Sequence, residues 1–242
     1  MELLVLGHKG MLGHMVVKYL QDQNISVNTL KTRWPVAQTE IKQFGGDYII
    51  NCIGSIPQKT DSFNLNWQLP IWLDLHSPCK VIHPGTDCEM DNDGYGISKN
   101  IASNYIRNLG RQTKSIKTSI IGPELFGNVS LLEWFLSQEG EVFGYTKAMW
   151  DGNTTLEWSK QCLQLIKNWD SFKSETILQG DKVSKYELLN IIKNVFNKNI
   201  SIIPKKEGKD KCLGGSFKTI GIEKQLTELK QFYYENKSNT AR

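Results

Sequence analysis

Paired cysteine motifs are missing from this chain of 242 residues. Its cysteines are odd in number and none forms a CxxC pair; the five are Cys52, Cys79, Cys88, Cys162 and Cys212. A disulfide framework needs an even set, and a structural zinc site needs closely spaced ligands. The spacing argues against both, so we predict a reducing compartment and no metal site.

Long apolar runs and blocks of like charge are missing too. No run of about 18 apolar residues occurs, and no basic segment followed by an apolar one opens the chain. The 29 basic and 25 acidic residues are interspersed, so the net charge of +4 forms no dense basic stripe of the kind that binds nucleic acid. We expect a soluble cytoplasmic protein that binds neither a membrane nor nucleic acid, and an anionic small molecule is compatible with the charge.

Internal repeats are also absent, and short apolar runs instead alternate with helical patterns. Five runs read as strands: LLVLG (3–7), ISVNTL (25–30), DYIINCIG (47–54), KVIHPG (80–85) and SIKTSIIG (115–122). This alternation is typical of a parallel sheet with helices on both faces. We predict an α/β fold with a Rossmann-type doubly wound parallel sheet.

The last third of the chain has a different pattern. Strand signals become sparse after Gly122, and four segments carry apolar residues at helical spacing: 131–140, 154–169, 184–196 and 222–235. We predict a first domain over residues 1–125 and a smaller, mostly helical lobe over residues 126–242. The chain is free to cross back between them.

Three glycines interrupt the first apolar run, LVLGHKGMLGHMV. A Rossmann first turn needs glycine for a tight turn, for close approach of a diphosphate, and for packing of the helix on the strand. These needs fit Gly7, Gly10 and Gly13 in that order. An ordinary glycine loop is the alternative. We expect this stretch to bind a dinucleotide through Gly7, Lys9, Gly10, Met11, Leu12 and Gly13, which makes residues 1–125 an NAD(P)-binding domain.

A carboxylate is missing where NAD sites place one, at the end of the second strand. The corresponding stretch, TLKTRW, offers Lys31 and Arg33 instead. Cations there suit a 2′-phosphate, which favours NADPH over NADH, although a solvated loop is the alternative. After the third strand, the small residues Asn51, Cys52 and Gly54 are compatible with a cofactor passing close by, or with an ordinary strand end.

The stretch YGISK places Tyr95 and Lys99 four residues apart, on one face of a helix. A tyrosine with an unperturbed pKa of about 10 needs a neighbouring ammonium to exchange a proton near neutral pH. The same spacing recurs at Tyr233 and Lys237. Placement distinguishes the two, because Tyr95 follows the fourth predicted strand. Thr86 stands just beyond that strand, where its hydroxyl can orient a substrate carbonyl; a plain Gly-Thr-Asp turn is the alternative.

In this order, the glycines, NCIG, GTD and YGISK resemble the extended short-chain dehydrogenase/reductase superfamily. Within it the chain looks most like the dTDP-4-dehydrorhamnose reductases, which reduce the 4-keto group of nucleotide-linked 6-deoxyhexuloses with NAD(P)H. The resemblance implies a triad of Thr86, Tyr95 and Lys99, with Asn66 matching an asparagine on the fourth helix of the superfamily. It also implies a role in glycan or surface-polysaccharide precursor synthesis.

Two departures from the family pattern affect the interpretation. The segment between Thr86 and Tyr95 is shorter than usual, and Cys88 stands where related dehydratases have an acid, with Glu89 one place later. Reduction is thus favoured over dehydration. An epimerase or dehydratase with retained NAD, and a non-catalytic dinucleotide-binding regulatory subunit, are the alternatives. The oligomeric state stays open, with a homodimer as one option.

The sugar nucleotide needs cations and flat surfaces around it. Beyond Thr86, we expect Lys117 on the fifth strand to contact it, together with Lys147, Trp150 and Asn153 from a loop before a helix. We expect this loop to close over the substrate, opposite Tyr95. For Trp150 the alternative is a core position, since large aromatic side chains more often pack than bind.

Overall fold

The structure is a computed structural model that describes residues 1–235 of the chain. The chain forms two compact units. The first contains Met1–Lys117 and Ser159–Thr176, and the second contains Thr118–Trp158 and the chain from Ile177 onward. We predicted a boundary at residue 125, with the chain free to cross back. In the structure the chain enters the second unit at Thr118 and returns to the first over Ser159–Thr176.

A seven-stranded sheet runs in the order β13-β10-β5-β4-β3-β1-β2. Pairing is parallel between β1 and both β2 and β3, between β3 and β4, between β4 and β5, and between β10 and β13. The strands are β1 (Glu2–Leu6), β2 (Ser26–Thr29), β3 (Tyr48–Asn51), β4 (Lys80–Gly85), β5 (Thr113–Lys117), β10 (Glu175–Gln179) and β13 (Phe217–Lys218). The predicted Rossmann-type parallel sheet is confirmed.

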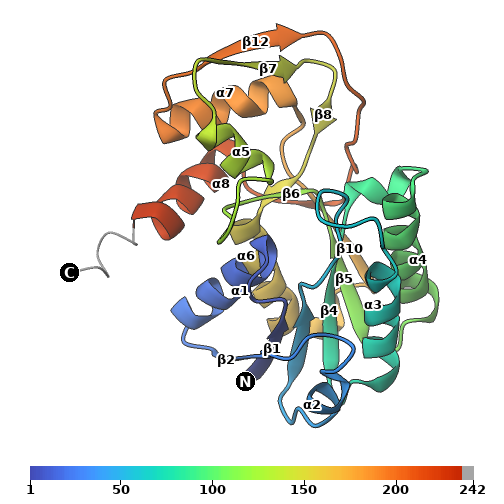
Figure 1. Ribbon diagram of the computed structural model, residues 1–242. Helices are drawn as coiled ribbons and strands as arrows, with labels where there is room; N and C mark the ends of the chain where they lie inside the picture. Colours follow the sequence, from blue (N-terminus) through green and yellow to red (C-terminus); the bar gives the residue numbers. More distant parts are fainter. Residues whose placement is uncertain (236–242) are drawn as a thin grey trace. The chain divides into compact units, whose positions relative to one another are not determined.

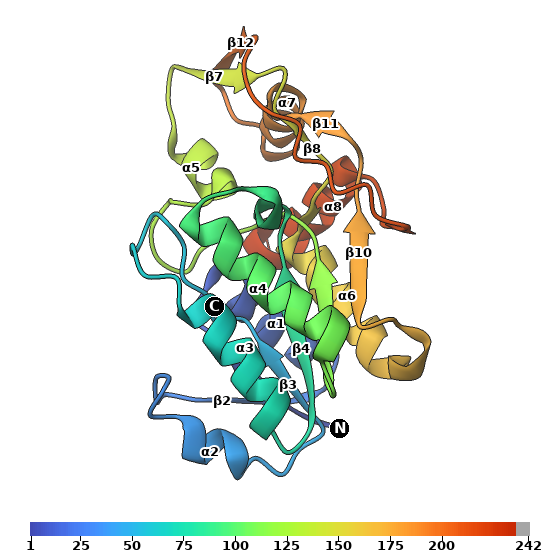
Figure 2. The same ribbon diagram turned by 90° about the vertical axis from the view of Figure 1, so that its right-hand side faces the viewer.

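Helices cover both faces of the sheet in the first unit, with α1 and the part of α6 from Ser159 on one face and α3 and α4 on the other (Figures 1 and 2). Their bounds are α1 (Met11–Asp22), α2 (Gln38–Lys42), α3 (Leu65–His76), α4 (Gly94–Leu109) and α6 (Thr155–Lys167), with 3₁₀ turns η1 (Asp87–Met90) and η2 (Trp169–Ser171). No helix among residues 1–235 is long and apolar enough to cross a bilayer.

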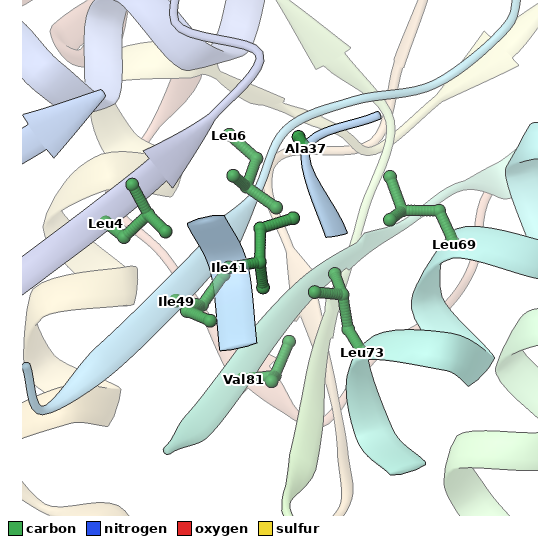
Figure 3. Close-up of a cluster of buried hydrophobic side chains, with 8 residues drawn as sticks. All are labelled: Leu4, Leu6, Ala37, Ile41, Ile49, Leu69, Leu73 and Val81. Atoms are coloured by element: carbon green, nitrogen blue, oxygen red, sulfur yellow. The ribbon is translucent and has the colours of Figure 1, made fainter. Parts of the chain in front are cut away.

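The core beneath α2 and α3 explains why these strands are apolar along their length. Side chains from β1, β3 and β4 meet side chains from the two helices in one cluster (Figure 3), made of Leu4, Leu6, Ala37, Ile41, Ile49, Leu69, Leu73 and Val81. Strands of a parallel sheet are buried on both faces, which removes the polar alternation of a half-exposed strand. This packing holds β1, β3 and β4 against α2 and α3.

A buried carboxylate on α3 is hydrogen-bonded to the backbone at the start of β5. Asp74 is 1% exposed and accepts hydrogen bonds from the backbone amides of Arg111, Gln112 and Thr113 and from the Tyr105 hydroxyl. Burial raises the pKa of Asp74, but these hydrogen bonds outweigh it and hold the pKa below its ordinary value. Asp74 therefore stabilises the fold through the charged form of its carboxyl.

One predicted strand is interrupted. The run 115–122 divides into β5 and β6 (Ile120–Ile121), and β6 pairs with β9 (Asn153–Thr154) outside the main sheet. At the break, Asn153 donates to the Thr118 hydroxyl over 2.8 Å, and its backbone amide donates to the Ser119 carbonyl. These partners lie far along the chain, so the apolar run alone could not reveal the break.

The second unit contains the predicted helices and several short strands that we did not predict. Besides the start of α6, the helical elements are α5 (Leu131–Ser137), α7 (Lys185–Phe196), α8 (Ile222–Leu229) and the π-helical turn η3 (Lys230–Glu235). Two-stranded sheets join β7 (Glu141–Tyr145) to β12 (Ser201–Lys205) and β8 (Met149–Trp150) to β11 (Val183–Ser184). The two-residue strands β8 and β11 carry too little periodicity for recognition from sequence, whereas β7 and β12, of five residues each, were missed despite their length.

Candidate active site

The glycine turn between β1 and α1 is as tight as its spacing predicts. Gly7 has a φ of +77°, and a Cβ there would lie 2.9 Å from the carbonyl of Cys52. A Cβ on Gly13 would lie 2.2 Å from the Gly7 carbonyl oxygen. A side chain at either position would collide with backbone, so these two glycines allow the turn to lie against β3 and the helix to lie against the turn.

The start of α1 leaves room for an anion. Gly10 is the exposed N-cap residue, without a side-chain hydrogen bond to the helix, and Lys9 beside it is exposed. Unpaired amides at a helix N-terminus attract phosphate. Met11 is half-buried and Leu12 is buried in the apolar face of α1. The structure thus brings Lys9 and Gly10 to the surface of the turn, whereas Leu12 and Gly13 support its packing.

The end of β3 lies beside this turn. Asn51 is buried, and its side chain bonds to His83 over 3.2 Å and accepts from the Ile53 amide over 3.1 Å. Cys52 is half-buried, and burial raises the pKa of its thiol, which opposes a nucleophilic role. Gly54 is exposed.

Lys31 and Arg33 follow β2, the edge strand of the sheet, and both are exposed. No salt bridge to either is found within residues 1–235. The exposure of both charges is compatible with a contact to a ligand at this edge and also with a solvated loop. The preference for a 2′-phosphate stays a prediction.

Thr86 is the N-cap residue of the turn η1, directly after β4. Its hydroxyl accepts from the Cys88 amide over 3.3 Å and donates to Asp87 over 3.0 Å. The Glu89 carboxylate returns to accept from the Thr86 amide over 2.9 Å, which completes a capping box. This reciprocal pair fixes the backbone of Thr86 at the carboxyl end of the sheet.

Helix α4 brings Tyr95 and Lys99 to the same turn. Asp93 caps the helix by accepting from the Gly96 amide over 2.7 Å. A Cβ on Gly96 would lie 2.4 Å from the carbonyl oxygens of Cys88 and Asp91, so glycine here lets α4 pack directly on η1. The spacing of Tyr95 and Lys99 places both on one face of α4.

The surroundings of Tyr95 favour its protonated form. Its ring packs edge-on against Phe63, with centroids 5.7 Å apart. The pKa of Tyr95 is raised well above its ordinary value, mainly by burial and further by the ionisable groups of Cys88, Asp87, Glu89 and Asp93. This is opposite to the lowering expected from the Lys99 ammonium. A phenol with a raised pKa stays protonated near neutrality, and it donates when the phenolate left behind is stabilised.

Lys99 is a buried residue, 7% exposed, whose ammonium has no hydrogen bond or ion pair within residues 1–235. A Cβ on Gly54 would lie 3.2 Å from Lys99 Nζ and 3.4 Å from Asn66 Oδ1, so both polar atoms lie close to Gly54. Burial lowers the pKa of Lys99, against the opposing effects of Glu89 and Cys88. An ammonium held in this way is expected to have a ligand.

Asn66 holds the segment after β3 in place. It lies on α3, accepts from the Ser55 amide over 2.7 Å, and donates to the Ser55 carbonyl and the Ser98 hydroxyl. It therefore connects the segment that carries Gly54 to the helix that carries Lys99.

The predicted substrate residues are divided between the units. Lys117 lies in the first unit, where its side chain is 11% exposed and forms an ion pair with Glu89. In the second unit, Lys147 is exposed, whereas Asn153 is fully buried and bonded to Thr118, Thr219 and Gln225. The side chains of Lys117 and Asn153 are thus bonded to other residues of the protein in this structure.

Trp150 is also buried, with 1% of its surface exposed. Lys185 Nζ lies over its ring at 5.5 Å from the centroid, and a Cβ on Gly152 would lie 2.5 Å from the ring. This burial favours the alternative stated for Trp150, a position in the core of the second unit, over a contact with the sugar nucleotide.

Replacing this side chain tests the assignment. We expect Trp150→Ala to lower the free energy of unfolding by about 3 to 5 kcal/mol, because a large buried aromatic side chain leaves a cavity. Denaturant unfolding measures this effect. Phe143→Ala in the same unit is the control, since Phe143 is 55% exposed and its loss leaves no cavity. A stable Trp150→Ala protein with a severalfold higher KM for the sugar substrate would instead support the binding role.

Sequence reasoning assigned no role at the site to Glu89, Asp93 or Ser98. A signal for Glu89 was present: a glutamate three residues after Thr86 is the spacing of a capping box. The pairing of Glu89 with Lys117 had no such signal, because the two residues meet only when β4 and β5 are neighbours. The second Tyr-x-x-x-Lys match has Tyr233 buried in η3, and Lys237 lies outside the described residues.

Comparisons with known proteins find similarity only in structure, since no family model and no curated protein matches the chain. A dTDP-4-dehydrorhamnose reductase from Bacillus anthracis in complex with NADP has a TM-score of 0.76 and 14% identity, covering 97% of this chain and 99% of that chain. The enzyme of that name from Clostridium acetobutylicum has a TM-score of 0.74 and 16% identity, covering 95% and 98%. A GDP-L-fucose synthetase from Naegleria fowleri has a TM-score of 0.68 and 14% identity, covering 98% and 94%. At these identities the likeness shows the fold: this chain shares the Rossmann-type α/β architecture of those proteins.

Proposed function

We propose that this protein is an NADPH-dependent reductase of the 4-keto group of a nucleotide-linked 6-deoxyhexulose. One observation carries the proposal: Tyr95 and Lys99 share a helix that packs on the turn of Thr86, at the carboxyl end of a parallel sheet, and Lys99 is buried with no hydrogen bond or ion pair within residues 1–235. Ligands of open α/β sheets bind at that edge. Two of the similar structures named above are dTDP-4-dehydrorhamnose reductases, which supports this substrate class.

Several features of the chain fit a dinucleotide. The turn at Gly7 and the uncapped start of α1 suit a diphosphate, and exposed Lys31 and Arg33 suit a 2′-phosphate. The buried ammonium of Lys99 suits the hydroxyl groups of a ribose. When bound, NADPH supplies the hydride that reduces the carbonyl carbon.

The chain supplies the proton and the orientation. Thr86 donates to Asp87 in this structure, and rotation of its hydroxyl redirects the proton to the substrate carbonyl. Tyr95 gives its phenolic proton to the carbonyl oxygen as that oxygen becomes a hydroxyl. The ammonium of Lys99 stabilises the phenolate left behind, and solvent then restores the proton. Hydride and proton together account for the added hydrogen.

Reduction fits the site better than dehydration, because elimination needs a free carboxylate base near the substrate to remove a proton from carbon. Glu89, the nearest acid after Asp87, is tied to the Thr86 amide and to Lys117. It is therefore not free to take a proton from the sugar. The product would serve as a precursor for a glycan or surface polysaccharide.

Turnover and cofactor content test the proposal together. The purified protein is assayed for NADPH oxidation with UDP-, dTDP- and GDP-linked 4-keto-6-deoxysugars, and its bound nucleotide is measured after dialysis. We expect NADPH oxidation with at least one of the three and little retained nucleotide. One equivalent of NAD that resists dialysis would favour an epimerase or dehydratase. No turnover together with tight binding to a partner enzyme would favour a regulatory subunit.

The cofactor preference has its own test. We expect Arg33→Asp to shift the preference from NADPH toward NADH, because a lost charge-assisted contact to phosphate costs about 1.5 to 3 kcal/mol. The ratio of kcat/KM for the two cofactors measures the shift. Lys18→Asp, on a partly buried position of α1, is a control for the change in net charge. Equal use of both cofactors by the unmodified protein would remove the basis for this prediction.

A further inference from the structure

The carboxylate of Glu89 is deeply buried beside the Thr86 turn, with 2% of its side chain exposed. One of its oxygens accepts from the Thr86 amide over 2.9 Å. The other lies 2.6 Å from Lys117 Nζ, whose side chain is 11% exposed. The mechanism described above gives neither residue a task.

The partners of Glu89 come from two adjacent strands. Thr86 follows the last residue of β4, Gly85, which is in register with Lys117, the last residue of β5. Lys117 therefore lies next to the end of β4, from where its side chain contacts Glu89. The carboxylate connects the end of β5 to the backbone amide of Thr86, and so fixes the direction in which the chain leaves the sheet.

Capping alone does not require this charge. A glutamine at the third position of a capping box also accepts from the N-cap amide, and a neutral residue avoids the cost of removing two charges from water. Buried ion pairs are poor sources of stability, and their best-attested use is to fix one arrangement among several. The segment between Thr86 and Tyr95 is short, so a small shift of η1 moves the Thr86 hydroxyl relative to Tyr95.

We propose that Glu89 and Lys117 are positioning residues that hold Thr86 in the orientation needed to bind the substrate carbonyl. This inference rests on the proposed reductase function and gives Lys117 a different task from the substrate contact predicted from sequence. Glu89 acts through the Thr86 amide, and Lys117 acts by orienting the Glu89 carboxylate.

Two charge-neutral double variants separate positioning from folding. Glu89→Gln with Lys117→Met removes both charges but keeps an oxygen for the Thr86 amide. Glu89→Leu with Lys117→Met also removes both charges and keeps a similar volume, but it offers no acceptor. Steady-state kcat and the KM for NADPH are measured for both, with the single variant Lys117→Met beside them.

We expect the Glu89→Leu double variant to lose about 10- to 100-fold in kcat relative to the Glu89→Gln double variant, because displacement of a group that orients the substrate costs rates of this order. The KM for NADPH stays the same in both. We expect Lys117→Met alone to have a lower kcat than the Glu89→Gln double variant, since the single change leaves a buried carboxylate without a counter-charge. Asp74→Asn is the control for stability: it weakens another buried carboxylate anchor in the same unit, and we expect a lower Tm with unchanged kcat.

Equal kcat in the two double variants would overturn the proposal. The proposal would also be overturned if the same ratio of kcat between the two double variants were found after Thr86→Val is added to both. Glu89 would then affect kcat without acting through Thr86. Failure of the proposed function itself is distinguishable, since it appears as no turnover by the unmodified protein with any of the three substrate classes.

Discussion

Tyr95→Phe is expected to lower kcat by about 100-fold or more, since a positioned general acid contributes factors of that order. The change keeps the aromatic ring against Phe63 and removes only the transferable proton. Binding of NADPH and the Tm should therefore change little. Steady-state kinetics at saturating NADPH, together with a direct binding titration, measure both effects.

Tyr233→Phe is the matched control for this variant. Tyr233 also begins a Tyr-x-x-x-Lys match, and it is buried with 3% of its surface exposed. Loss of its hydroxyl should leave kcat unchanged. Near-normal turnover by Tyr95→Phe would mean that another group donates the proton.

The pH dependence of reduction provides a second readout for Tyr95. Reduction needs the protonated phenol, and the pKa of Tyr95 is raised from its ordinary value of 10.0, mainly by burial. The proton is present below that pKa and is lost only as the pH rises through it. We therefore expect no decline in kcat from tyrosine ionisation up to at least about pH 10.

Lys99→Met is expected to lower kcat by about 100-fold and also to weaken NADPH binding, since the lysine has two tasks. Lys99 is 7% exposed, and its ammonium has no hydrogen bond within residues 1–235. Methionine keeps the length of the side chain but offers neither charge nor donors. Rapid kinetics measure kcat, and fluorescence titration measures the Kd for NADPH.

The combined loss of kcat and of NADPH binding distinguishes Lys99 from Tyr95, whose replacement should lower kcat alone. Removal of the buried charge relieves a desolvation penalty, so we expect the Tm of Lys99→Met without cofactor to be unchanged or higher. A lower kcat with an unaltered Kd would assign the lysine to proton transfer alone. A large loss of Tm with normal kcat would show that the ammonium serves the fold.

Much of the sheet and part of the site could be predicted from local sequence. The apolar runs predicted β1 to β5 because strands buried on both faces leave few polar positions. The glycines at 7 and 13 mark backbone contacts that exclude any side chain. Tyr95 and Lys99 could be placed on one helix face because four residues make about one turn.

The remaining features depend on contacts between distant segments. Lys117 was predicted to contact substrate, but β5 lies beside β4 and its ammonium meets Glu89. Asn153 was also predicted to contact substrate, but its side-chain oxygen accepts hydrogen bonds from Thr219 and Gln225. Polar residues at strand ends look alike in sequence whether they serve a ligand or the fold.

Transfer of deuterium to the sugar from NADPH that carries deuterium at both C4 positions of its nicotinamide tests the central claim most directly. The protein is incubated with this cofactor and each 4-keto-6-deoxysugar nucleotide, and the product is examined by NMR and mass spectrometry. The account predicts one deuterium bound to C4 of the sugar for each NADPH consumed. A product without deuterium at C4, or no product from any of the three nucleotide classes, would contradict it.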